Sequence, residues 1–395
     1  MELDFLPSPL EDRPGLMMRD PFRYSEMTLV VPPPLVPLLE MFDGEQTEEE
    51  LREELFRMSG DVRSGEVMEH LRDALWQAGF LEGERLEELR AERERAFAEA
   101  DTREAALAGG AYPDERGELG EWLKEQGVEA AGEDELLGIA APHVSPEGGW
   151  ASYTAAYRAL SPALAEKVFV VLGTSHYGEP EKFGLTRKGF RTPFGEARTQ
   201  AELAEWLAGR AKRASKMEDY CHAVEHSIEF QVVFLQALYG PEVMILPVLC
   251  GPFARSLYMG GAPEDDEGVR EFLEALGELQ AREGKRLCWV MGVDMAHMGR
   301  RYGDALPMEA ATGAMLEVAA RDKDRIGRLE VGDAGGFWEL VQPNHDDLKW
   351  CGSAPLYTFL KAVPGARGRL RQYEQWNIDE QSVVTFGALE FRSAP

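Results

Sequence analysis

The sequence has few cysteines, a deficit of basic residues and no long uninterrupted apolar run. Four cysteines among 395 residues, with no C-x-x-C pair, exclude a disulfide scaffold and fit a reducing compartment. The 42 basic residues against 71 acidic ones give a net charge of −29, which disfavours binding to nucleic acid or to an anionic membrane. Because neither an export signal nor a membrane-spanning segment is found, we expect a cytoplasmic protein.

The composition is otherwise that of an ordinary folded protein. Apolar residues make up 44% and charged residues 29% of the chain, which argues against disorder, collagen-like repeats and a membrane bundle. The length is enough for two or three domains. Neither a Walker A loop nor a G-x-G-x-x-G segment occurs, so no nucleotide phosphate site is predicted.

The first hundred residues form a distinct acidic segment, with 25 acidic residues against 11 arginines. The run MTLVV predicts a strand, and Thr47 with Glu50 predicts a capping box that starts a helix. A second helix is expected from Ser64, followed by an edge strand at Phe80 and Leu81. This order of elements predicts a small winged-helix-like domain over residues 1–82.

The segment resembles the PqqD-like modules, winged helices that hold a peptide along an exposed strand edge. The resemblance implies a peptide partner for residues 1–82. An acidic accessory or dimerisation domain is the alternative interpretation, and the acidic excess argues against DNA readout in both cases. The Glu-, Arg- and Ala-rich residues 83–107 are expected to form a solvated helical linker.

From residue 108 to 395 the pattern alternates between strands and helices. Continuous apolar runs predict strands at LLGIAAPH, VFVVLGTSH, VMILPVLCG, LCWVMGVDMAH and SVVTFGALEF, with helices such as AELAEWLAGRA and IEFQVVFLQALY between them. Continuous rather than alternating apolar strands indicate a sheet covered on both faces. We therefore predict an α/β fold with a mostly parallel, twisted sheet and helices on each side.

Histidines and one cysteine mark the ends of these elements. His143, His176 and His297 each close a predicted strand run, His226 opens a helix, and Cys351 precedes another helix. Ligands of open α/β sheets bind at the carboxyl ends of the strands, so these side chains can converge there. Imidazole with thiolate suits iron, copper or zinc, and a helix N-terminus would favour the thiolate.

Seven motifs in order carry a family resemblance: GIAAPHVS, VVLGTSHYG, RTPFGEA, VEHSIEFQ, ILPVLCG, VDMAHMG and WCGSAP. They resemble the MEMO family, whose bacterial members include AmmeMemoRadiSam system protein B, over roughly residues 103–395. The family is similar in fold to the class III extradiol dioxygenases, whose iron is non-heme. The chain departs from the usual family pattern after its P-H motif, where it reads VSPEGGWASY.

The resemblance implies a metal site made of His143, His176 and Cys351, because family members hold iron or copper through two histidines and a cysteine. Exchanging the dioxygenase carboxylate for a thiolate alters the redox behaviour of iron, so ring cleavage does not follow from the fold.

The same resemblance assigns further residues to the pocket. Asp294 is a fourth ligand or a carboxylate that orients the ligands, and His226 and His297 exchange protons with bound oxygen or substrate. Glu225 and Glu229, from the E-H-S-I-E motif, are expected to line the same pocket.

The remaining histidines and cysteines have other interpretations. His222 is expected to be structural, His70 to lie on the surface, and His345 is left open between pocket and surface. The other thiols are read as small core or structural residues; they are Cys221, Cys250 and Cys288.

Three functions remain open at this point. The first is a mononuclear iron or copper centre for redox chemistry with oxygen and a small organic substrate. The second is a non-catalytic metal-binding or scaffold protein, and the third is a zinc-dependent hydrolase that uses a metal-bound water. The resemblance also implies radical-SAM and AMMECR-type proteins as partners.

Overall fold

The computed structural model describes residues 3–8, 10, 12–60, 63–133 and 135–394. Contacts divide the chain into two units, Met1–Glu99 and Ala100–Pro395. Helix α4 (Glu84–Glu99), which covers most of the expected linker, belongs to the first unit. Ala100–Leu107 belong to the second unit, where β4 (Thr102–Arg103) pairs with β8 (Gly189–Thr192).

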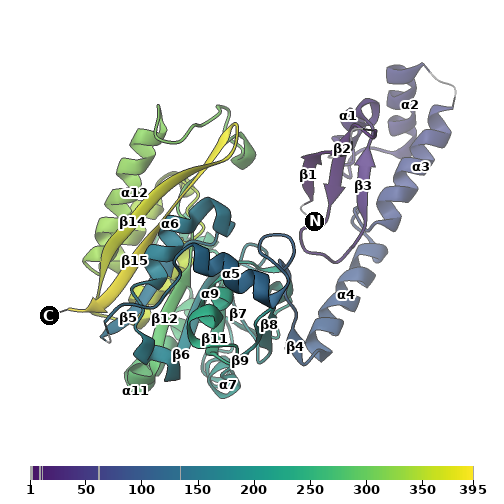
Figure 1. Ribbon diagram of the computed structural model, residues 1–395. Helices are drawn as coiled ribbons and strands as arrows, with labels where there is room; N and C mark the ends of the chain where they lie inside the picture. The colour runs from purple at the N-terminus through teal and green to yellow at the C-terminus, as the bar shows by residue number, and fades with distance from the viewer. Residues whose placement is uncertain (1–2, 9, 11, 61–62, 134, 395) are drawn as a thin grey trace. The chain divides into compact units, whose positions relative to one another are not determined.

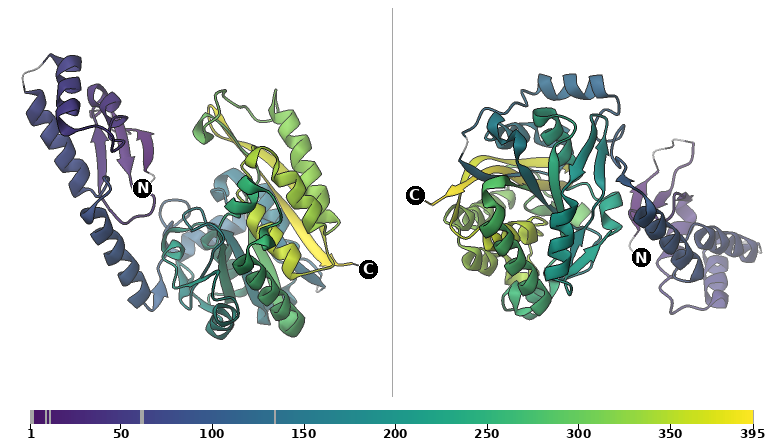
Figure 2. Two further views of the ribbon diagram at one scale, coloured as in Figure 1. Left: turned by 180° about the vertical axis from the view of Figure 1, so that it is seen from behind. Right: turned by 90° about the horizontal axis from the view of Figure 1, so that it is seen from below.

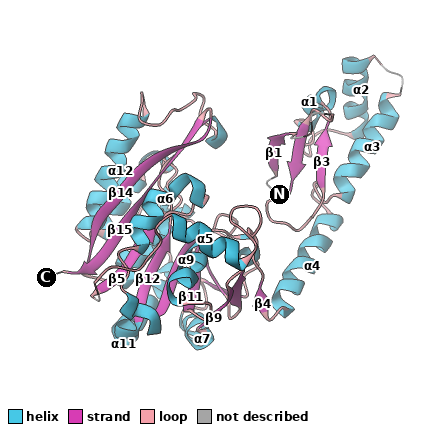
Figure 3. Ribbon diagram, viewed as in Figure 1, coloured by secondary structure: helices cyan, strands magenta, loops and turns pink. Residues whose placement is uncertain are grey.

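The first unit combines a small antiparallel sheet with helices (Figure 3). Its strands lie in the order β1 (Asp4–Pro7), β2 (Leu16–Arg19) and β3 (Thr28–Val31), and the last of these is the strand predicted from MTLVV. Helices α1 (Val36–Leu39), α2 (Glu48–Ser59) and α3 (Ser64–Gln77) follow. The predicted capping box starts α2, since Thr47 N donates to the Glu50 carboxylate at 2.8 Å and Glu50 N donates to Thr47 Oγ1 at 3.3 Å.

One expectation for the first unit is wrong. Phe80 and Leu81 form no strand, because Gly79 ends the preceding helix at φ +72° and α4 begins at Glu84. Phe80 instead joins the apolar core beneath the helices. The three strands of this unit therefore precede its helices in the sequence.

The second unit contains a large mixed sheet whose centre is parallel (Figure 1). Four neighbouring strands run in parallel, in the order β5 (Leu136–Ala141), β12 (Leu287–Gly292), β6 (Val168–Thr174) and β11 (Met244–Cys250). Strand β15 (Ser382–Ser393) is antiparallel to β5. The mostly parallel α/β sheet is confirmed, but the run SVVTFGALEF enters it in the opposite direction.

The direction of β15 follows from its connection. Strand β14 (Ala366–Asp379) precedes it and pairs with it along almost its whole length, and Asp379 lies opposite Ser382. A connection this short can join only antiparallel neighbours. The remaining strands are β7 (Phe183–Leu185), β9 (Gly195–Thr199), β10 (Ser215–Met217) and β13 (His297–Gly299).

Helices cover both faces of this sheet (Figure 2). Alternate residues of each central strand enter different cores. In β6, Val170 and Leu172 pack with helices of one face, whereas Phe169 and Val171 pack with helices of the other. The first face carries α7 (Ala201–Arg210), α11 (Glu267–Glu283), α12 (Met315–Glu330), α13 (Ala334–Val341) and α14 (Ser353–Ala362). The second carries α5 (Arg116–Glu125), α6 (Pro146–Tyr157) and α9 (Glu229–Tyr239).

Two short helices, α8 (Cys221–Val224) and α10 (Ala254–Met259), complete the unit. Cys221, Cys250 and Cys288 are buried within the two cores, as their sequence surroundings suggested. Among the described residues, no helix has both the length and the apolar character that crossing a membrane requires.

Candidate metal centre

Each of three parallel strands is followed by a histidine at the same edge of the sheet. His143 follows β5, His176 follows β6, and Asp294 and His297 follow β12. Because these strands are parallel neighbours, their carboxyl ends open into a common cavity of about 600 Å³. The cavity is lined by Leu107, His143, Val144, Ser145, His176, His226, Phe230, Asp294, His297, Arg301, Tyr302, Lys349, Cys351, Trp376, Ile378 and Val384.

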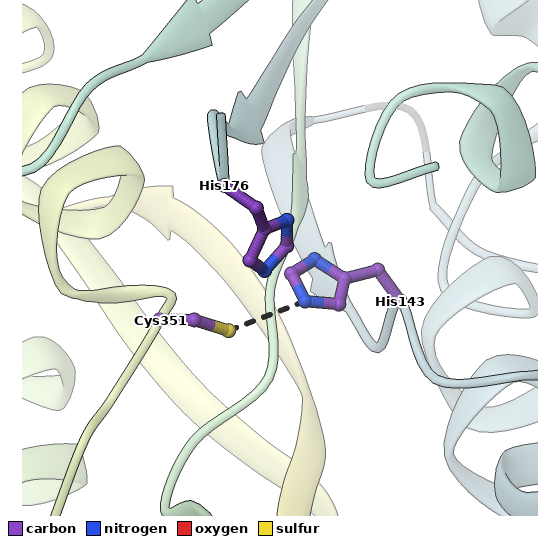
Figure 4. Close-up of side chains that lie close together, drawn as sticks. All are labelled: His143, His176 and Cys351. Atoms are coloured by element: carbon purple, nitrogen blue, oxygen red, sulfur yellow. Dashed lines mark hydrogen bonds between the residues drawn. The ribbon is translucent and has the colours of Figure 1, made fainter. Parts of the chain in front are cut away.

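His143, His176 and Cys351 converge in this cavity, where His143 is buried, Cys351 is half-buried and His176 is exposed. One ligand atom from each side chain lies within 4.8 Å of the others. Figure 4 shows the two rings and the thiol directed toward one another from three separate segments, and Cys351 Sγ lies 3.2 Å from His143 Nε2. Two imidazole nitrogens and a sulfur at this spacing form a suitable donor set for a transition metal.

The His143 ring is fixed by backbone groups. Its Nδ1 donates to the carbonyl of Gly292 at 2.9 Å, which leaves Nε2 as the lone-pair nitrogen facing the cavity. Asp294 Oδ1 accepts the backbone N–H of His143 at 2.9 Å and that of Val144 at 3.3 Å, while Oδ2 lies 3.5 Å from His143 Nε2. Burial lowers the pKa of His143 well below its usual range, so the ring is neutral, as a metal ligand must be.

The His176 ring is fixed by a carboxylate instead. Its Nδ1 donates to Glu225 at 3.0 Å, and the same carboxylate accepts the backbone N–H groups of His176, His226 and Ser227. Burial disfavours charge on both partners, yet their attraction raises the pKa of His176 and lowers that of Glu225 well beyond the usual values. A carboxylate behind a ligating histidine fixes its tautomer and strengthens it as a donor.

The Cys351 thiol depends on a close approach of two loops. Gly352 N donates to the carbonyl of Asp294 at 3.0 Å, and a Cβ at position 352 would lie only 2.7 Å from that oxygen. Burial raises the pKa of the Cys351 thiol, although His176 opposes the rise. Helix α14 begins at Ser353, and a metal that bound here would displace the thiol proton.

A buried hydrogen-bond network fixes the loop that carries Cys351. Asp322 accepts Trp350 Nε1 at 2.6 Å and the hydroxyls of Tyr373 and Thr385 at 2.7 Å. Asp346 accepts the backbone N–H of Trp350 at 2.8 Å. Sequence reasoning missed this network, because Asp322 lies in a charged helical stretch that reads as solvent-exposed.

The predicted proton-handling residues surround the donor set. The His226 ring stacks on that of His176 with centroids 4.8 Å apart, and His297 Nδ1 lies 3.0 Å from the carbonyls of Met295 and Lys349. Burial raises the pKa of Asp294 to about 7 and lowers that of His297 to about 4. The geometry gives these groups access to the cavity; their catalytic roles stay predictions.

Other expected residues lie outside the cavity lining. Glu225 lies behind the two histidines that it orients. The expectation that Glu229 lines the pocket is wrong, because it is buried behind the wall and accepts the backbone N–H of Leu107 at 2.9 Å. His222 is buried beside Phe190, His345 lies against Tyr258, and His70 is exposed on α3; none of the three belongs to the lining.

Arg103 is a further residue that sequence reasoning missed. Its side chain is fully buried, pairs with Glu229, and donates to the carbonyls of His222 at 2.8 Å and Glu225 at 3.0 Å. Arg103 therefore fixes the backbone of the E-H-S-I-E segment, but a lone arginine in a polar stretch gives no sequence signal for this role.

Comparisons with known proteins show which family the chain resembles. Residues 103–390 match the family model described as Memo-like protein. A MEMO1 family protein of Aquifex aeolicus is 26% identical over 95% of both chains, and one of Thermus thermophilus is 29% identical over 73% of this chain and 82% of its own. An uncharacterized protein from Escherichia coli K12 aligns at 12% identity and TM-score 0.35, covering 58% of this chain and 89% of its own. On the family match and the relatives, the chain belongs to the MEMO family.

Proposed function

We propose that the chain holds one iron or copper ion between His143, His176 and Cys351 and uses it for redox chemistry on a small organic substrate. The observation that carries the proposal is the convergence of the three donor atoms within 4.8 Å. The donor set fits a metal, because both rings use Nδ1 in hydrogen bonds to Gly292 and Glu225 and keep Nε2 for a ligand.

The chain's own residues have separate tasks in this proposal. Bound iron or copper would supply electron transfer and oxygen activation, which no side chain here provides. Glu225 keeps His176 in one tautomer, and Asp294 holds the His143 backbone. His226, His297 and Asp294 reach the cavity and can accept or donate protons as substrate reacts.

The test is the metal content of anaerobically purified protein, before and after Fe(II), Cu(I) and Zn(II) are offered in competition. We expect about one iron or copper per chain, and Cys351→Ser or His176→Ala should abolish stoichiometric metal. The matched control is His345→Ala, because His345 lies outside the cavity and contacts Tyr258.

The other outcomes discriminate between the functions. Stoichiometric zinc with oxygen-independent hydrolysis would support the zinc hydrolase instead. Iron or copper without oxygen uptake for any substrate would support a metal-binding or scaffold protein. Unchanged metal content in both ligand variants would refute the assignment of this site.

A further inference from the structure

We infer that the cavity binds a small carboxylate with a planar apolar body, with the carboxylate at Arg301. The inference rests on the proposed function, because it assumes that the substrate enters the cavity above the metal ligands. Two cations, Arg301 and Lys349, line the cavity of a chain whose net charge is −29. Cations concentrated at one opening attract an anionic ligand and repel a cationic one.

The guanidinium of Arg301 has hydrogen-bond donors available for a ligand. Its nearest acidic atom is Asp379 Oδ2 at 3.9 Å, beyond hydrogen-bond distance, and the guanidinium makes no hydrogen bond to any residue within the described ranges. A guanidinium offers a planar fork of N–H groups that matches a carboxylate in a bidentate pair.

Lys349 is more firmly engaged. Its Nζ donates to Asp304 Oδ1 at 2.8 Å, and Asp304 Oδ2 accepts the backbone N–H of Gly299 at 2.7 Å. Lys349 therefore adds positive charge from a fixed position, while Arg301 is free to form the direct contact. The acidic side chain of the lining, Asp294, accepts two backbone N–H groups, those of His143 and Val144.

Part of the cavity lining is apolar. It consists of Leu107, Phe230, Trp376, Ile378 and Val384. The Trp376 ring packs flat against the backbone of Gly148, since a Cβ at that position would approach three ring atoms within 2.7 Å. Gly148 lies in the first turn of α6 and belongs to VSPEGGWASY, the stretch that departs from the usual family pattern, so this departure positions a planar aromatic surface in the cavity.

The residues that line the cavity differ in their exposure to solvent. The Arg301 side chain is 48% exposed, whereas His143 is 2% exposed. His143 therefore lies deepest, whereas Arg301 and the metal ligand His176, whose side chain is 27% exposed, both reach solvent. A ligand that fills the 600 Å³ cavity would place its carboxylate at Arg301, its planar body against Trp376 and its reacting end at the metal ligands.

The experiment compares naphthoate with its neutral isostere naphthamide, by calorimetry and ligand-observed NMR on the purified full chain, with and without metal. We expect naphthoate to bind at least about tenfold more tightly, since hydrogen bonds to charged groups are about twice as strong as neutral ones. Added salt should reduce that preference. Trp376→Leu should weaken both probes to a similar extent, because it removes the planar wall but no charge.

The charge variants test the assignment to Arg301. Arg301→Met should abolish the preference, and Arg301→Lys should restore part of it. Arg300→Met is the matched control, because the neighbouring Arg300 is exposed and lies outside the cavity lining. Equal binding of the two probes, no binding of either at millimolar concentration, or an unchanged preference in Arg301→Met would overturn the inference.

Failure of this inference is distinguishable from failure of the proposed function. An Arg301-dependent preference in a chain that holds no iron or copper would keep the carboxylate site and refute the redox centre. Stoichiometric metal without a preference for naphthoate would do the reverse.

Discussion

The two units of the chain differ in the burial of their ion pairs. In the first unit the core is apolar, and ion pairs such as Arg52–Glu69 are about half-exposed. In the second unit the Arg103–Glu229 pair is fully buried, and Arg325–Asp346 is nearly so. Buried charges are costly unless each is paired and hydrogen-bonded. Arg103 binds the backbone of the E-H-S-I-E segment and Asp346 binds the backbone of Trp350 next to Cys351, so both buried pairs serve the geometry of the candidate site.

The comparison implies that the units draw stability from different interactions. The first should depend on apolar packing and be indifferent to single charges, whereas the second should be sensitive to individual polar groups. Hydrogen exchange of peptides from each unit, measured in urea, separates the two unfolding transitions and so tests this difference directly.

The largest effect is expected from Arg103→Met in the second unit. The change leaves the Glu229 carboxylate buried without its cation and frees the carbonyls of His222 and Glu225. We expect a loss of about 3–5 kcal/mol in the free energy of unfolding of this unit, because one partner of a buried pair remains unpaired. A loss below about 1 kcal/mol would contradict the idea that this pair supports the E-H-S-I-E segment.

A somewhat smaller effect is expected from Leu75→Ala in the first unit. Leu75 is 1% exposed in the apolar core, and truncation of a buried leucine costs about 2–4 kcal/mol. The matched control is Arg52→Ala, which removes exposed ion pairs with Glu48 and Glu69 and should cost less than about 1 kcal/mol. If Arg52→Ala destabilised the unit as much as Leu75→Ala, the contrast between the units would be lost.

The smallest of the three effects is a pH dependence confined to the second unit. Burial lowers the pKa of His222 to about 4, whereas an unfolded histidine titrates near 6.5. Between these values the unfolded chain binds a proton that the folded unit does not, so stability falls as the pH falls. His222 should account for a loss of about 2 kcal/mol between pH 7 and pH 4.5.

Urea unfolding of wild type and His222→Phe at both pH values measures this contribution. The variant cannot titrate at position 222, so its loss of stability between the two pH values should be smaller by the His222 share. Identical pH dependence in the two proteins would show that the His222 pKa is not depressed in the folded unit.

The sequence predicted the strands well where burial is complete and their direction less well. Runs such as VFVVLGT and LCWVMG are apolar throughout because both faces of these strands are covered. The run of β15 reads the same way, and nothing in its residues reveals that it is antiparallel to β5. Strand direction depends on the connection and the neighbour, and β14, whose residues alternate in exposure, was not predicted at all.

The candidate site was predicted in outline and missed in its supports. His143, His176 and Cys351 could be placed by strand ends and motifs, and the structure brings them together. Arg103 and Asp322 are polar residues in polar stretches, so their burial depends on partners far along the chain. The radical-SAM, AMMECR-type and peptide partners stay predictions that binding experiments must test.

The order in which the site residues occur along the sequence has a consequence for biosynthesis. His143 and His176 emerge from the ribosome long before Cys351, and the wall residue Val384 and the supporting hydroxyl of Thr385 come from β15, later still. A nascent chain that already displays both imidazoles therefore has neither the thiol nor the enclosure. On the proposed function, the three donor atoms come together only after Cys351 and β15 have been synthesised, so a metal would be loaded late in maturation.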